Sequence, residues 1–133
     1  MIAPTTDTEV REALAQTLTD VAGLRTHAFT PGTISPPAAI IIEVDVQFDA
    51  AMGRASDNMT VRVRLFTGGE LRSAQLALSK LIYQVRDALW EDPSLGGVVS
   101  DCRLSRRVGD SEGQVDVGGA TYTVVDVEVE VVT

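Results

Sequence analysis

The sequence is poor in the residues on which most active sites depend. Its 133 residues include one cysteine, Cys102, and one histidine, His27. A lone cysteine excludes an internal disulfide and a cysteine-based metal site, and a lone histidine excludes a histidine-based metal site. The two lie far apart in the sequence, so a catalytic Cys–His pair has no local support. We therefore predict a protein that is not an enzyme and has no metal or cofactor, with His27 half-exposed on a short strand.

Phosphate-binding motifs are also missing. Gly68-Gly69 precedes a predicted helix, where free backbone N–H groups can hold an anion. However, neither G-x-G-x-x-G nor G-x-x-x-x-G-K-[ST] occurs, and Glu70 would repel a phosphate. The glycine pair is more typical of a turn between a hairpin and a helix.

Long apolar runs are absent. No 18-residue apolar run occurs, and no basic segment precedes an apolar one, so the sequence predicts neither a membrane span nor a secretory leader. We expect one domain, residues 1–133, with no membrane contact, kept in the cytosol unless it leaves in a larger assembly. Residues 1–5 show no periodic pattern and predict a flexible N-terminal arm.

Positive charge is scarce as well. The net charge is −8, which disfavours a protein that binds nucleic acid by neutralising phosphates. Residues 108–133 contain no Lys or Arg, and their six carboxylates predict an acidic surface: Asp110, Glu112, Asp116, Asp126, Glu128 and Glu130. The last three alternate along one strand, a pattern that is more often solvated than bound to a divalent cation.

Two groups of arginines stand on other predicted strands. Arg62 and Arg64 belong to one strand, and Arg103, Arg106 and Arg107 belong to another. They either hold an acidic partner or pair with the acidic C-terminal strand across the sheet, and the second arrangement is favoured.

The clearest element that the sequence predicts is a long amphipathic helix over residues 69–90. Glu70 suits its positive N-terminal end, and Asp92-Pro93 ends it. Its apolar residues recur at intervals of three and four, so they share one side: Leu71, Ala74, Leu78, Leu81, Ile82, Val85 and Leu89. We expect this side to be the main source of core stability, at roughly 1.5–3 kcal/mol per large side chain.

A second apolar row follows the same helix. Leu76, Tyr83 and Trp90 are spaced seven residues apart and fall roughly opposite the first set, because a helix advances about 100° per residue. A helix that is apolar on two sides is either internal or in contact with another subunit. The sequence leaves both possibilities open.

The remaining pattern predicts an α+β fold with the order α-β-β-α-β-β. Thr6 and Glu9 suggest a capping box for a first helix that runs to about residue 21. Alternating apolar residues predict two hairpins in a single, mainly antiparallel sheet, with both helices packed on one face. The expected strands are 38–49, 59–66, 98–108 and 122–132, with a possible short strand at 24–29 and loops at 49–57 and 109–119.

Several of these features occur together in a familiar order. A short N-terminal helix and a Pro-rich loop precede Val61-Arg62-Val63-Arg64-Leu65-Phe66-Thr67, and Gly-Gly-Glu-Leu-Arg-Ser-Ala-Gln then leads into the long helix. Gly118-Gly119-Ala120-Thr121-Tyr122 precedes the last alternating strand. This organisation resembles the tail-terminator proteins of long-tailed (siphovirus-type) bacteriophages, over nearly the whole chain.

The resemblance implies a structural virion protein without catalytic residues. Its expected form is a homo-hexameric ring at the head-proximal end of the tail tube, assembled in the host cytoplasm. Such a ring ends tube polymerisation, joins the tail tube protein to the head-tail connector or stopper protein, and lets DNA pass without sequence-specific binding.

The resemblance implies a role for two sets of residues. Leu76, Tyr83 and Trp90 suit a subunit interface. The six carboxylates of residues 108–133 suit a channel surface that repels DNA phosphates. The loops at 49–57 and 109–119 are of the kind that becomes ordered against neighbouring subunits.

Two alternatives remain open from the sequence. One is another ring protein of the virion, such as a connector protein or a tail tube subunit. The other is a small-molecule-binding α+β module, which should have a closed apolar pocket with convergent polar groups.

Overall fold

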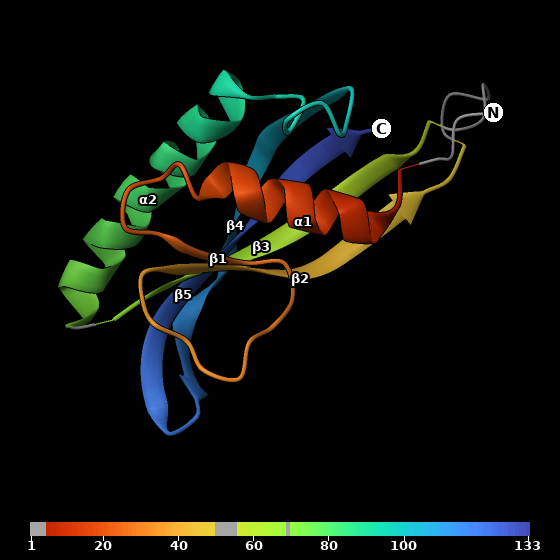
Figure 1. Cartoon of the computed structure of the whole chain (residues 1–133). Helices are drawn as coiled ribbons and strands as arrows, with labels where there is room; N and C mark the ends of the chain where they lie inside the picture. Colours follow the sequence, from red (N-terminus) through yellow and green to blue (C-terminus); the bar gives the residue numbers. More distant parts are fainter. Residues whose placement is uncertain (1–4, 50–55, 69) are drawn as a thin grey trace.

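The computed structural model describes residues 5–49, 56–68 and 70–133, and it has the predicted α+β fold. Both helices lie on one face of a single, mainly antiparallel sheet (Figure 1). The sheet has five strands, because the possible strand near residues 24–29 does form. The elements are α1 (Asp7–Leu18), β1 (Arg25–His27), β2 (Ala38–Gln47), β3 (Asn58–Thr67), α2 (Leu71–Glu91), β4 (Asp101–Val117) and β5 (Ala120–Val132).

The strand order across the sheet is β1-β2-β3-β5-β4. Only β1 and β2 are parallel; every other neighbouring pair is antiparallel. The short β1 pairs with Ala38–Ile40 alone, so the rest of β2 has no strand beside it on that side within the described residues. The 17-residue β4 forms the opposite edge. The sheet therefore has two long stretches of edge strand at which another strand can add.

The first helix begins where its cap residues predict. The Thr6 hydroxyl accepts a hydrogen bond from the Glu9 backbone N–H at 3.2 Å, and the Glu9 carboxylate accepts one from the Thr6 N–H at 3.3 Å. This confirms the capping box. The helix buries Val10, Leu14 and Leu18 in the core between the helices and the sheet.

The predicted apolar side of α2 is confirmed with one exception. Ala74, Leu78 and the following members are buried against β3, β4 and β5. Leu71 is 47% exposed, so its predicted place in the core is wrong. It lies on the predicted side of the helix but in the first turn of α2, where residues 71–73 are all exposed and Ala74 is the first buried residue.

The face of the sheet away from the helices is only partly covered. The segment 28–37 packs Ile34 against Phe66 and Val124 in a second, smaller apolar cluster. The Tyr122 hydroxyl donates a 2.9 Å hydrogen bond to the Ile34 carbonyl, and the ring of Tyr122 meets Phe66 edge-on at 6.0 Å between centroids. The rest of this face carries charged side chains.

The predicted loop at 109–119 is wrong. β4 continues to Val117, and the glycines fall at an irregularity in its pairing with β5, between Val108 and Gly113. A bulge of this kind leaves residues unpaired without ending the strand, which is why a glycine-rich run can be mistaken for a loop. Gly118 and Gly119, with φ of 60° and 83°, form the predicted tight hairpin turn.

The other predicted mobile parts fall mostly outside the described residues, which omit 1–4 and 50–55. Thr5, the last residue of the predicted arm, is attached by a 3.3 Å hydrogen bond from its hydroxyl to the Val98 carbonyl. The loop at 49–57 is fixed where it is described. Asp57 is buried, its carboxylate accepts a 2.9 Å hydrogen bond from the Asp49 N–H, and its N–H donates to the Thr133 hydroxyl at 2.8 Å.

Candidate interaction surfaces

The uncovered part of the sheet, here called the charged face, alternates in charge from strand to strand. On β2, Val44 and Val46 pack toward the helices, so Glu43 and Asp45 point to the other face. The register places Glu43 opposite Arg62 of β3. Together the charged face comprises Glu43 and Asp45 on β2, Arg62 and Arg64 on β3, Asp126, Glu128 and Glu130 on β5, and Arg103 and Arg106 on β4.

The predicted pairing of arginines with the C-terminal strand is confirmed for all of them except Arg107. Arg106 Nε lies 2.8 Å from a carboxylate oxygen of Glu128, and Arg103 Nη2 lies 2.9 Å from one of Glu130. On the same edge strand, Arg107 lies 3.1 Å from Glu112. The Arg103–Glu130 pair is well exposed, so it contributes little to stability, about 0–1 kcal/mol. Glu128 is less exposed, with 23% of its side-chain surface accessible.

Asp126 is the best-buried charge of the protein's described part, with only 1% of its surface exposed. It accepts two hydrogen bonds from Arg64, at 2.8 and 3.1 Å, and lies 3.4 Å from Arg62 Nε. This side-chain hydrogen bond and the charge of Asp126 raise the pKa of Arg64, while burial opposes them.

The predicted one-sign acidic surface is therefore wrong for the C-terminal strand. Asp126 is buried, and Glu128 and Glu130 are each paired with an arginine. The arginines that compensate these carboxylates lie on β3 and β4, before residue 108 in the sequence. The composition of residues 108–133 alone therefore did not reveal them. Asp110 and Asp116 are exposed, and Asp116 accepts a hydrogen bond from the Thr121 hydroxyl.

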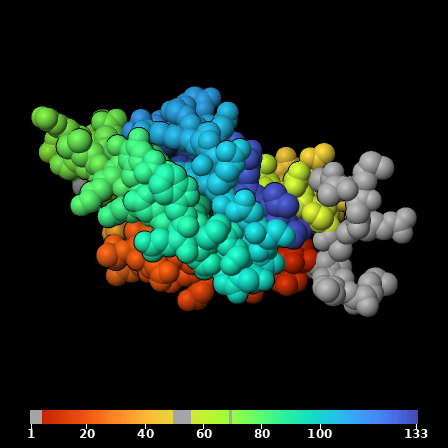
Figure 2. All heavy atoms as spheres, turned by 90° about the horizontal axis from the view of Figure 1, so that it is seen from above, coloured from red at the N-terminus to blue at the C-terminus, as the bar shows by residue number. Residues whose placement is uncertain are grey.

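The second apolar row of the long helix is exposed. Leu76, Tyr83 and Trp90 have 65%, 57% and 65% of their surface accessible, so none of the described helices and strands covers them. Arg86 lies over both aromatic rings, 5.0 Å from the Tyr83 centroid and 4.5 Å from that of Trp90. Figure 2 shows α2, in green to cyan, crossing the surface between α1 and β4 with its outer side uncovered. We call Leu76, Tyr83 and Trp90 the α2 row.

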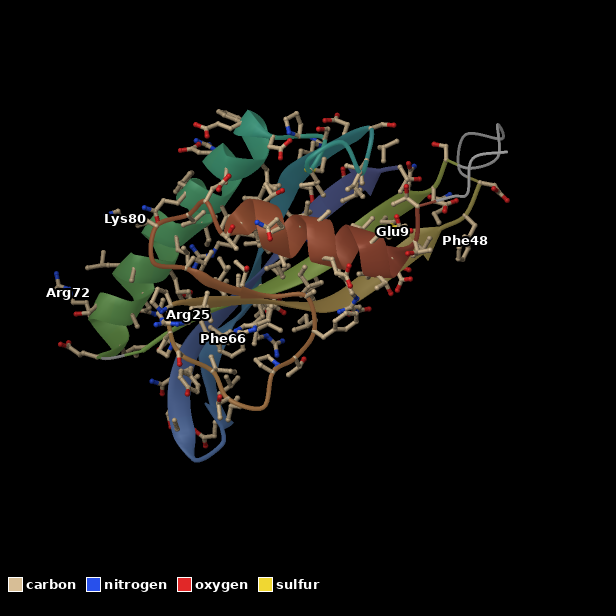
Figure 3. All side chains as sticks on the ribbon, in the orientation of Figure 1. Glu9, Arg25, Phe48, Phe66, Arg72 and Lys80 are labelled. Atoms are coloured by element: carbon tan, nitrogen blue, oxygen red, sulfur yellow. The ribbon has the colours of Figure 1, made fainter. Side chains whose placement is uncertain are left out.

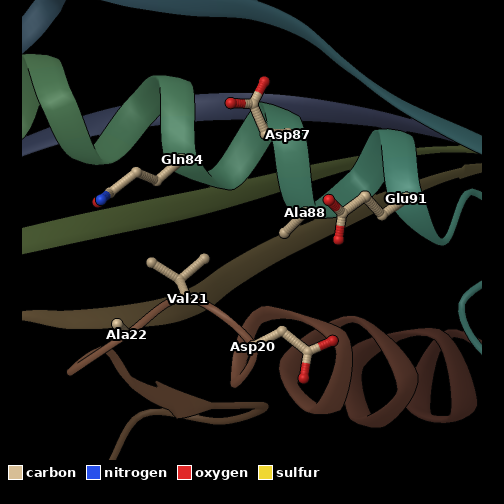
Figure 4. A pocket seen from close by; sticks show the side chains of 7 residues that line it. All are labelled: Asp20, Val21, Ala22, Gln84, Asp87, Ala88 and Glu91. Carbon is tan, nitrogen blue, oxygen red and sulfur yellow. The ribbon is translucent and has the colours of Figure 1, made fainter.

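Two hollows lined by described residues are open grooves. One lies between the C-terminal ends of α1 and α2, where Asp20, Asp87 and Glu91 surround a small apolar floor of Val21 and Ala88 (Figure 4). Another lies beside β4 and is lined by three arginines, two serines, Tyr83 and two apolar residues. Neither brings together a nucleophile, a base and an oxyanion donor.

Residues of catalytic type are isolated from one another. His27 is half-exposed on β1, as predicted, and Cys102 is buried on β4. No group of three or more His, Cys, Asp or Glu residues with metal-binding geometry occurs in the parts of the chain that the structure describes. None of the helices there is both long and apolar enough to cross a membrane.

No family model and no curated protein matches this chain. Two surfaces are left uncovered by the described helices and strands, the charged face and the α2 row. The seven-residue spacing predicted the α2 row, but not whether it is covered or exposed. The charged face was not predictable, since its pattern appears only once strand order and register are known.

The Cys102 thiol should be almost unreactive in the folded protein. Burial raises its pKa from 9.0 to about 12, and the charges of Asp101 and Asp92 add to the shift. Since the thiolate is the reactive form, labelling by a disulfide reagent at pH 8 should be on the order of a thousandfold slower than in denaturant. A stoichiometric labelling burst in native buffer would contradict this.

The same shift predicts a pH dependence of stability. The folded state keeps the Cys102 proton over a range where the unfolded chain loses it, so the favourable contribution is present below pH 9 and lost as the pH rises toward 12. Urea unfolding of the wild type and a Cys102→Ala variant at increasing pH measures this. The difference in free energy of unfolding between wild type and variant should be constant below pH 9 and should change above it.

Proposed function

We propose that this chain is a structural subunit of a bacteriophage tail, a tail terminator that assembles into a ring at the head-proximal end of the tail tube. The observation that carries the proposal is that, at one level across the sheet, the charged-face side chains of the two open edges have opposite charge. Glu43 and Asp45 mark the β2 edge, and Arg103 and Arg106 mark the β4 edge. A ring needs two different, complementary surfaces on each subunit, and these edges supply them.

Strand direction supports the same contact. Since β2, β3, β5 and β4 are successively antiparallel, β4 runs opposite to β2. If the β2 of a second copy adds beside β4, it continues both the antiparallel order and the alternation of charge. Backbone hydrogen bonds between edge strands would provide affinity, and opposite charges would fix the order in which the edges meet.

The charged face also suits a surface past which DNA slides. Each of the five arginines on β3 and β4 has a nitrogen within 3.4 Å of a carboxylate oxygen. A phosphate beside β3 and β4 therefore meets only arginines that already have an acidic partner, and binding there that depends on releasing counterions is weak. We place Asp110, Glu112 and Asp116 on the channel side as well, where the exposed Asp110 and Asp116 add negative charge.

In this proposal the protein performs no catalysis. Its partners are further copies of itself, the tail tube protein and a connector or stopper protein, and its place is the virion. The isolation of Cys102 and His27 and the open form of the grooves favour a contact surface over a reaction site.

Ring formation can be measured by native mass spectrometry and multi-angle light scattering. We expect a closed homo-hexamer, with rings at one end of the tubes when tail tube protein is added. A protein that stays monomeric at high concentration with tube protein present would refute the proposal. Long tubes formed by the protein alone would identify a tube subunit instead.

An edge variant tests the contact itself. Asp45 is exposed at the β2 edge. In Asp45→Lys a positive charge would meet the arginines of the β4 edge of the next copy. The subunit contact should weaken at least tenfold, because like charges meet across the interface. Glu12→Lys, an equal charge reversal on the exposed side of α1, is the matched control and should leave assembly unchanged.

A further inference from the structure

The α2 row belongs to a longer regular pattern on the outer side of α2. Lys80 and Asp87, both exposed, stand between its members, so that the series 76, 80, 83, 87, 90 has spacings of 4, 3, 4 and 3. These are the spacings of a heptad seam, with apolar and charged residues at alternate positions. Figure 3 shows Lys80 pointing away from the sheet on the same helix as Arg72.

Two copies of this pattern are complementary when the two helices run antiparallel. At about 1.5 Å per residue, Leu76 and Trp90 both lie about 10 Å from Tyr83 along the helix, in opposite directions. Lys80 lies about 4.5 Å before Tyr83, and Asp87 about 6 Å after it. An antiparallel copy of α2 therefore brings Leu76 to Trp90, Tyr83 to Tyr83 and Lys80 to Asp87.

We propose that the α2 row binds the α2 row of a second copy, with the helices antiparallel and a two-fold axis at Tyr83. This goes beyond the proposed function: ring closure uses the sheet edges, whereas a two-fold contact joins subunits or rings in pairs. Charge decides the direction, because parallel helices would set Lys80 against Lys80 and Asp87 against Asp87.

Arg86 also fits this arrangement. Its side chain is 38% exposed, and one terminal nitrogen lies 3.4 Å from Asp87. In antiparallel helix pairs, equivalent flanks meet, so the exposed end of the Arg86 guanidinium would lie beside Ser79 of the second copy. The Ser79 hydroxyl can accept a hydrogen bond from it.

The aromatic part of the row is already ordered in the single chain. Arg86 stacks on both Tyr83 and Trp90, which limits the freedom of the two rings before any partner arrives. Rigid aromatic side chains lose little entropy on binding and are typical centres of interfaces. One helix from each copy is a small interface, and we expect a dissociation constant of about 1–100 µM.

Cross-linking at the axis tests the geometry directly. In a Tyr83→Cys variant the two new thiols face each other only if the contact is two-fold, and mild oxidation should give a covalent dimer on a non-reducing gel. Cys102 is buried and stays out of the reaction. Glu12→Cys, exposed on α1, is the control and should remain monomeric. A Tyr83→Cys protein that stays reduced would overturn the inference.

Charge reversal tests the pairing of Lys80 with Asp87. Lys80→Glu should weaken self-association at least tenfold by sedimentation velocity, and Lys80→Glu with Asp87→Lys should return it to within about threefold of wild type. All three proteins should have the same circular dichroism, because both positions are exposed. A double variant as weak as the single one would refute the pairing.

The proposed ring and the proposed two-fold contact can be refuted independently of each other. If Tyr83→Cys cross-links but no hexamer forms, the proposed ring is wrong and the two-fold contact stands. If hexamers form while Tyr83→Cys stays reduced, the ring stands and the two-fold contact is wrong. Tyr83→Asp, which places two negative charges at the axis, should abolish pairing and leave ring closure intact.

Discussion

Replacing Leu78 by alanine should lower the free energy of unfolding by about 3–4 kcal/mol, the largest effect that we expect from a single substitution. Leu78 is completely buried among side chains of both helices and the sheet. Its truncation removes buried methyl groups and leaves a cavity that the rigid sheet cannot fill, which costs about 2–5 kcal/mol in comparable cores. The melting temperature should fall by about 10 °C.

Leu76 provides a matched control for that experiment. It lies two residues away in the same helix and is 65% exposed. The Leu76→Ala change is chemically identical, and helix propensity slightly favours it, so the free energy of unfolding should change by no more than about 0.5 kcal/mol. Urea unfolding at a protein concentration well below that of self-association measures both. Equal losses would mean that the two sides of α2 are wrongly assigned.

The helices could be predicted from the sequence because their signals are local. The spacing of Leu78, Val85 and Leu89 fixes which side of α2 is buried, and Asp92-Pro93 fixes where it ends. A capping box at Thr6 and Glu9 does the same for the start of α1. Leu71 shows the limit of this reasoning, since helical angle alone does not tell how far along the helix the core extends.

Strand order could not be predicted, and the interaction surfaces depend on it. Period-two alternation tells which residues of β3 share a face, but not that β5 lies between β3 and β4. Only the register places Arg62 between Glu43 and Glu128. Gly109 and Gly113 were misleading for a related reason, because glycine occurs both in loops and at bulges within paired strands.

Asp126 also shows what the sequence alone does not reveal. In the sequence it is one of three alternating carboxylates, equivalent to Glu128 and Glu130. In the structure it is fully buried, while Glu130 retains half of its side-chain exposure. The neighbours on β3, Arg62 and Arg64, make the difference, and no local signal in the last strand reports them.

A substitution of Asp126 by alanine should therefore destabilise the protein by about 2–3 kcal/mol. Breaking a buried ion pair typically costs about 3–5 kcal/mol, because the remaining charge is left without a partner. Here Arg62 and Arg64 are about one-third exposed, with side-chain exposures of 32% and 34%, so water partly compensates them and the loss is smaller.

Glu130→Ala is the matched control, since it removes a carboxylate from the same strand face at an exposed ion pair. Arg103 and Glu130 have 68% and 50% of their side chains exposed, and the change should stay within about 0.5 kcal/mol. Salt provides a second criterion, because a buried pair is screened much less than an exposed one. The loss at Asp126 should persist in about 1 M salt. A small loss of unfolding free energy in Asp126→Ala that disappears in salt would contradict this prediction. It would show that Arg62 and Arg64 are fully hydrated and that their pairing with Asp126 behaves like an exposed ion pair.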